Sequence, residues 1–165
     1  MAKYLVLIIF LILMLGLSIG FASGLSIFGG TFNLIVIILV AGFFLEVEKE
    51  GLVVALVLAV IYDFYTFSYF GLAIMAVLLI YFAIEFLEKK LSPDPGYLLF
   101  LVYVFFGSLI FDLIVFNLRS TSIIFVDALV NLLIALPLLI ILRYFVSVLK
   151  LYRLVRPQEK RIALF

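Results

Sequence analysis

The stretch YLLFLVYVFFGSLIFDLIVFN, residues 97–117, holds a single charged side chain, Asp112. The hydrocarbon core of a bilayer is about 30 Å thick, and a helix needs about 20 mostly apolar residues to cross it. The stretch meets this requirement, and it follows directly on Pro93, Pro95 and Gly96, which cannot continue a helix from the preceding segment. It therefore predicts a helix that spans a membrane.

Similar apolar runs lie on both sides of this stretch. The charged turn Glu46–Glu50 and the breaker Leu91–Gly96 separate some of them. The six predicted spans cover residues 4–22, 29–45, 51–67, 70–87, 97–117 and 123–145. The sequence thus predicts an all-α integral membrane protein, a single transmembrane domain over residues 1–165 with a basic cytoplasmic tail at residues 146–165. It leaves open whether the glycine-rich connection Gly24–Phe32 is re-entrant.

The composition agrees with lipid as the solvent. Hydrophobic residues make up 69% of the chain and charged residues 13%, whereas a soluble domain is roughly 45–50% apolar and about 25% charged. The chain contains no cysteine and no histidine, which removes disulfides, thiolate metal sites and the commonest general base. We therefore expect no enzymatic activity, no catalytic residues, no cofactor and no bound metal.

The basic residues indicate the orientation, because cytoplasmic loops carry an excess of lysine and arginine. If the N-terminus lies in the cytoplasm, every lysine and arginine except Arg119 falls on the cytoplasmic side. The sequence therefore predicts that both termini are cytoplasmic. Cleavage of the first run as a signal peptide near Gly20–Ala22 is the alternative, and the length of that run and its single Lys3 argue against it.

Three glycines of the first run, Gly16, Gly20 and Gly24, are spaced four residues apart. Residues four apart share one face of a helix, so these glycines form a flat strip that another backbone can approach closely. The strip is a candidate interface for the transmembrane helix of a partner. Packing inside the chain's own bundle explains the spacing equally well.

Polar side chains also interrupt the predicted helices, and they do so near one predicted depth, in the outer half of the membrane. The candidate intramembrane cluster consists of Asp63, Asp112, Asn117, Arg119, Asp127 and Asn131. A lipid-facing aspartate at the bilayer centre costs about 2.5–3.5 kcal/mol, so we expect these side chains to be protected inside the bundle. They form either a structural cluster that caps helices and pairs with Arg119, which we favour, or a ligand or proton site. An intramembrane aspartyl protease is disfavoured, since Asp112 lacks the preceding Gly-x-Gly of those enzymes.

One longer stretch carries a resemblance to a known family. From Asn33 to Ala76 the sequence runs through an apolar helix, a short charged turn that ends in Gly51, and a second apolar helix with Asp63 near its end. A short loop follows at Ser68–Gly71, where the family usually has a proline, and the last helix holds NLLIALP at residues 131–137. In these features the chain resembles the MreD family of bacterial rod-shape-determining membrane proteins.

This resemblance implies a multi-pass protein of the bacterial plasma (inner) membrane that takes part in side-wall peptidoglycan synthesis. Its partners would be an MreC-like single-span membrane protein and, through it, the other proteins of the elongation complex, together with membrane lipid and no nucleic acid. The family brings no catalytic residues, so the implied role is that of a scaffold or regulator.

The second hypothesis belongs to another functional class. The fold of the MreD family resembles the six-helix substrate-binding subunits of energy-coupling-factor transporters, which bind a vitamin or a metal in a pocket open to the outside. The outer cluster of aspartates and asparagines would suit such a pocket. However, those subunits usually dock on their transporter through an Ala-xxx-Ala spacing in the first helix, where this chain has its glycines.

Overall fold

The computed structural model describes residues 32–66, 71–91, 96–115 and 121–151. They form the helices α2 (Leu34–Phe44), α3 (Glu48–Thr66), α4 (Leu72–Leu91), α5 (Tyr97–Val115) and α6 (Thr121–Leu151). All regular secondary structure in these ranges is helical, which confirms the predicted all-α class for this part of the chain. The predicted first span, residues 4–22, and its glycine strip at Gly16, Gly20 and Gly24 lie outside the described residues.

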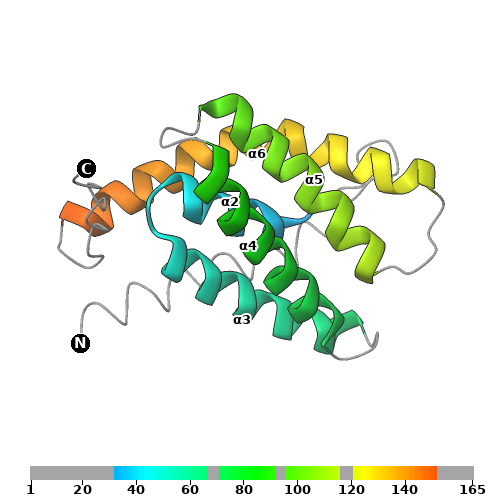
Figure 1. The fold of residues 1–165 in the computed structure, drawn as a ribbon. Coiled ribbons are helices and arrows are strands. Elements are labelled where there is room, and N and C mark those ends of the chain that lie inside the picture. Colours follow the sequence, from blue (N-terminus) through cyan, green and yellow to red (C-terminus); the bar gives the residue numbers. More distant parts are fainter. Residues whose placement is uncertain (1–31, 67–70, 92–95, 116–120, 152–165) are drawn as a thin grey trace.

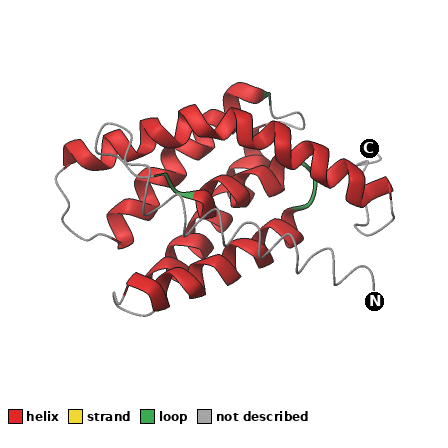
Figure 2. Cartoon of the chain, turned by 180° about the vertical axis from the view of Figure 1, so that it is seen from behind, coloured by secondary structure: helices red, strands yellow, loops and turns green. Residues whose placement is uncertain are grey.

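The described helices pack around α2 (Figure 1). Helix α2 contacts each of α3, α4, α5 and α6, and α3–α4, α4–α5 and α5–α6 are also packed pairs. Short connections join these consecutive helices, so neighbours in sequence run antiparallel. The view from behind shows the same succession of helices, with α6 lying across the molecule as the longest element (Figure 2). Consequently α3 and α5 end, and α6 begins, at one end of the bundle, on the right of Figure 1.

Helix α2 is apolar on all sides and enclosed over all but its last residue. Its residues Leu34–Phe43 are all buried, with no polar face among them. At 11 residues it is about 16 Å long, roughly half the thickness of a bilayer core. Within the predicted run of residues 29–45, the described helix begins at Leu34, where the side chain of Asn33 caps its N-terminus.

Helices α2 and α3 meet backbone to backbone at a pair of glycines. A Cβ atom on Gly51 would lie 2.8 Å from the Cα atom of Gly42, and one on Gly42 would lie 3.0 Å from the Cα atom of Gly51. The connecting turn holds Glu46 at φ 60, and the amide of Val47 donates to the carbonyl of Gly42 at 2.9 Å. The glycine after the charged turn is thus a close-packing position.

Helix α6 runs over 31 residues and contains Pro137 without ending there. The ring of Pro137 lies on an exposed face, so the carbonyl that loses its helical partner is not enclosed by other helices. The helix is longer than the predicted span at residues 123–145 and continues into the predicted tail. Among the described helices, α5 over Tyr97–Val115 and α6 over Ser122–Ser147 are long and apolar enough to cross a membrane.

We predict that Gly51→Ala destabilises the protein. The added methyl would have to displace the backbone of Gly42, and such overpacking costs about 1–3 kcal/mol, more than the gain of about 1 kcal/mol in helix propensity. Gly96→Ser is the matched control, because nothing lies within 4 Å of a Cβ at Gly96 and serine is favoured before a helix. Thermal unfolding followed by circular dichroism should show a lower midpoint for Gly51→Ala only; equal midpoints for both variants would contradict the close contact.

Candidate functional site

A buried hydrogen-bond chain links α2, α5 and α6. Asn131 on α6 is fully buried, and its Nδ2 donates to Oγ of Ser108 on α5 at 2.9 Å. The Ser108 hydroxyl in turn donates to the carbonyl of Val104 at 2.8 Å. On its other side, Oδ1 of Asn131 accepts a hydrogen bond from the backbone N–H of Asn33. One amide side chain therefore satisfies groups on two other helices.

Asn33 uses its own side chain to start α2. Its Oδ1 accepts from the backbone N–H groups of Ile35 at 3.1 Å and Val36 at 3.4 Å. The first N–H groups of a helix have no partner within the helix, and a buried donor left without one costs about 1–3 kcal/mol. Asn33 and Asn131 together thus allow α2 to begin inside an apolar bundle.

Asp63 near the end of α3 performs the same task for α4. Its Oδ2 accepts from the N–H of Gly71 at 2.9 Å, and its Oδ1 accepts from the N–H of Ala73 at 3.1 Å. A carboxylate also suits the positive end of the helix dipole. Asp63, which is buried, thereby joins the end of α3 to the start of α4.

Asp112 and Asp127 lie on the same seam between α5 and α6 as the Ser108–Asn131 hydrogen bond. Each is four residues from a partner in that bond, and because the two helices are antiparallel, both carboxyl groups fall one turn further toward the same end. They are 3% and 1% exposed, respectively.

The structure thus brings part of the predicted cluster together. Asn131, Asp112 and Asp127 share the α5–α6 seam, whereas Asp63 makes its hydrogen bonds to the start of α4. An edge-on contact between the rings of Tyr62 and Phe111, with centroids 6.0 Å apart, joins α3 and α5 beside these residues. Asn117 and Arg119 lie outside the described residues.

Ser108 is the site residue that the sequence interpretation missed. A lone serine in an apolar helix usually bonds to its own backbone, which Ser108 also does, so the residue type gave no signal. The one feature of the sequence that could have indicated Ser108 is its position one helical turn before Asp112, on the same face of the helix. The described residues contain no group of three or more histidine, cysteine, aspartate or glutamate side chains that could hold a metal ion.

The opposite end of the bundle carries exposed charge. Burial and the nearby Glu85 carboxylate raise the pKa of Glu48 above its ordinary value, against the opposing effect of Lys49 and Lys89. Burial and Glu48 likewise raise the pKa of Glu88. Lys89 forms an ion pair with Glu85 at 2.8 Å. This end therefore concentrates carboxylates that repel one another.

Comparisons with known proteins do not add a family or a function. No protein-family model, curated protein or solved structure matches the chain. Any assignment therefore has to come from the residues and their arrangement.

The hydrogen-bond chain predicts non-additive mutational effects. Ser108→Ala should destabilise the protein by about 1 kcal/mol or more, because it removes the partner of the buried Asn131 amide. Asn131→Ala should cost more, since it also removes the acceptor of the Asn33 N–H. In the double variant no Asn131 amide remains to be orphaned, so the combined loss should fall short of the sum by about 1 kcal/mol. Chemical unfolding of the four proteins measures this coupling, and strict additivity would show that the bond contributes nothing.

The raised carboxyl pKa values predict a pH dependence. A carboxyl group whose pKa is higher in the folded state favours folding most below its ordinary value of 4.5, and this contribution is lost as the pH rises through the folded-state pKa. Glu88→Gln should therefore raise the unfolding midpoint at pH 8 and have little effect at pH 4. Glu50→Gln, at an exposed position, serves as the control. If Glu88→Gln raised the unfolding midpoint more at pH 4 than at pH 8, the predicted pH dependence would be wrong.

Proposed function

We propose that the chain is a multi-pass protein of the bacterial inner membrane, with about six spans and both termini in the cytoplasm. The observation that carries this proposal is the chemistry of the outward faces. On α4 and α6 the exposed positions are occupied by large apolar side chains, among them Met75, Leu79, Phe82, Phe125, Leu129, Leu133 and Ile140. Asp63, Ser108 and Asn131 are buried instead. Continuous apolar surface of this kind is what a bilayer, rather than water, stabilises.

The degree of burial of the two longest apolar helices supports the same conclusion. In both α5 and α6 only 44% of the most apolar window is buried within the described fold. The core helix of a soluble protein would be buried over most of its length. The remaining apolar positions therefore need a partner or a lipid environment.

The helix interfaces also suit a membrane. Between helices in lipid, association depends on close packing, and small residues at the interface allow it. Several alanines are fully buried between the described helices, namely Ala55, Ala59, Ala73, Ala76, Ala128 and Ala135. Together with the contact between Gly42 and Gly51, they give the bundle small-residue interfaces.

Within that membrane, the proposed role is non-catalytic: a scaffold or regulator of the cell-shape and peptidoglycan elongation complex, acting through an MreC-like single-span partner. The support is the resemblance over Asn33–Ala76 to the MreD family. In the described structure Asn33, Gly51 and Asp63 of this stretch serve in helix capping and close packing.

The alternative, a substrate-binding subunit of an energy-coupling-factor-type transporter, would take its ligand at the outer end, where Asp63, Asp112 and Asp127 lie. A described pocket lies at the other end of the bundle, beside Tyr97 and Arg143. The gene next to this one separates the two proposals: a single-span protein with a periplasmic coiled coil supports the scaffold, and an ATPase supports the transporter.

The orientation can be tested with single cysteines, since the chain has none. Lys90→Cys at the end of α4 should react with a membrane-impermeant thiol reagent only after the cells are permeabilised. Tyr65→Cys, exposed near the end of α3, should react in intact cells. The reverse labelling would overturn the proposed orientation, and recovery of the chain in the soluble fraction would overturn the membrane location.

The role is tested by depletion in the bacterium that carries the gene. We expect rod-shaped cells to become round, and expression of the chain to restore the rod. An affinity-tagged copy should co-purify with a single-span membrane protein after mild detergent extraction. Unchanged cell shape together with co-purification of an ATPase would instead support the transporter subunit.

A further inference from the structure

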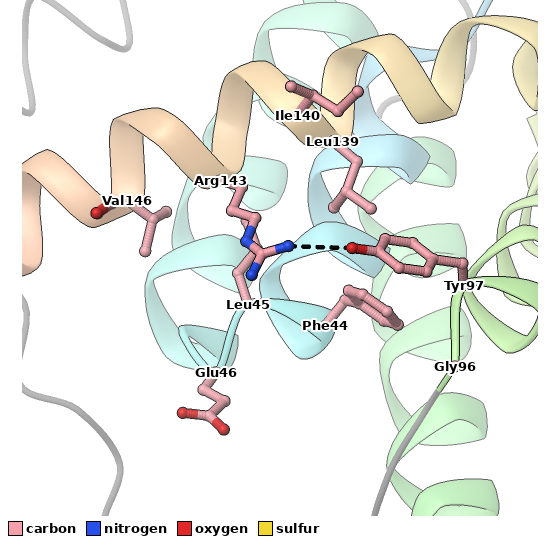
Figure 3. A pocket seen from close by; sticks show the side chains of 10 residues that line it. Phe44, Leu45, Glu46, Gly96, Tyr97, Leu139, Ile140, Arg143 and Val146 are labelled. Atoms are coloured by element: carbon pink, nitrogen blue, oxygen red, sulfur yellow. Dashed lines mark hydrogen bonds between the residues drawn. The ribbon is translucent and has the colours of Figure 1, made fainter.

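The described pocket has a volume of about 600 Å³ and lies where the end of α2, the start of α5 and the second half of α6 meet (Figure 3). Phe44, Leu139, Ile140 and Val146 give it apolar walls. Its lining is thus mostly hydrocarbon, although the pocket lies at the charged end of the bundle.

Arg143 supplies a cation to this apolar pocket. Its Nη1 donates to the hydroxyl oxygen of Tyr97 at 3.0 Å, and the Tyr97 ring packs against Phe44 with centroids 5.6 Å apart. Figure 3 shows the guanidinium and the hydroxyl directed toward each other across the pocket. Because the tyrosine oxygen accepts from Arg143, its own hydrogen remains available to a further acceptor. The pair therefore presents several donors and a positive charge at one point.

Two other basic residues at this end, Lys89 and Lys90, already have partners within the chain. Lys89 pairs with Glu85, and the Lys90 ammonium lies 4.5 Å from the centre of the Phe86 ring. No carboxylate among the described residues lies within 4.0 Å of the Arg143 guanidinium. Lys90 and Arg143 thus both have a neutral partner, and of the two only Arg143 lines the pocket. An anion in the pocket would balance its charge.

We propose that the pocket binds a phospholipid of the inner leaflet, with the phosphodiester on Arg143 and Tyr97 and the upper part of an acyl chain along the apolar wall. This inference rests on the proposed membrane location. In that orientation α6 changes from apolar residues to Arg143 at the cytoplasmic surface, which is the depth of the lipid phosphates. Tyrosine is typical of this interface, and arginine forms a planar fork that suits phosphate oxygens.

Two features favour a lipid over a soluble phosphate. The apolar walls can bury the hydrocarbon of a ligand, and inorganic phosphate or a sugar phosphate has no acyl chain to place there. Basic pockets between transmembrane helices also suit lipid headgroups. In addition, Glu46 lines the pocket, and its carboxylate repels a doubly charged group about twice as strongly as a singly charged one. A phosphodiester carries a single negative charge.

The test uses the full chain, extracted from membranes into a neutral detergent and titrated with dioleoyl-phosphatidylglycerol while its unfolding temperature is measured. The lipid should raise the unfolding temperature of the parent protein. Arg143→Gln should require a roughly tenfold or higher lipid fraction for half of the shift, because a charge-assisted hydrogen bond is lost. Tyr97→Phe, which keeps the ring against Phe44, should weaken the response by a smaller factor.

Lys90→Gln is the matched control, since it removes one positive charge from the same end and should respond like the parent. Parent-like titration of both Arg143→Gln and Tyr97→Phe would overturn the lipid site. An equal shift with inorganic phosphate or glycerophosphate would overturn the lipid in favour of a soluble ligand. A chain that is found in the membrane but fails these titrations disproves the pocket alone, whereas a chain found in the soluble fraction disproves the membrane location and the pocket together.

Discussion

The buried beginning of α2 is the constraint on which the other helices depend. A helix that starts inside an apolar bundle exposes its first N–H groups to a place without water, where each unsatisfied donor is costly. Asn33 satisfies two of them with its side chain, and its own N–H is satisfied by Asn131 of α6. Since Asn131 also bonds to Ser108 of α5, the solution for α2 sets the register between α5 and α6. Sliding these helices by one turn would break both hydrogen bonds.

At the other end of α2, successive contacts fix the positions of α3 and then of α4. The close approach of Gly42 and Gly51 fixes how α3 leaves the turn, and α3 then carries Asp63 to the two N–H groups that begin α4. Each step uses a small residue or a short polar side chain to join two helices. Apolar side chains fill the remaining space. A few local contacts therefore determine the relation of α2 to α3 and α4.

The sequence predicted the helical class and the interruption after α2, because a charged turn stops an apolar helix through local chemistry, whereas α6 continues through Pro137. It predicted a break at Glu46–Glu50, and the structure has one between Phe44 and Glu48, so that α3 begins inside the charged segment. The predicted breaker around Pro93 lies outside the described residues. The sequence could not locate the start of α2, because Ile27, Phe28 and Phe32 keep the stretch partly apolar around Gly29, Gly30 and Thr31. In addition, the N–H of Asn33 at this start bonds to Asn131, which lies 98 positions away in the chain. Hydropathy also identified the buried carboxylates and asparagines as exceptional. Hydropathy could not predict the hydrogen-bond partner of each residue, because Asp63 bonds to nearby residues in the chain while Asn131 bonds to other helices across the bundle.

The polar groups at the two ends of the bundle differ in whether they bond within the fold or face a pocket. In the membrane that we propose surrounds the chain, apolar contact alone draws helices together weakly, so packing and internal hydrogen bonds must hold them. Asn33, Asn131 and Asp63 use their hydrogen-bonding groups for this purpose, which gives that end an architectural function. At the opposite end the donors of Arg143 and Tyr97 face a pocket that other parts of the described fold do not fill. A ligand that binds through hydrogen bonds or charge is therefore expected at the charged end. A partner that contacts the exposed lengths of α4 or α6 meets an apolar surface, so the shape of that surface must determine which partner binds.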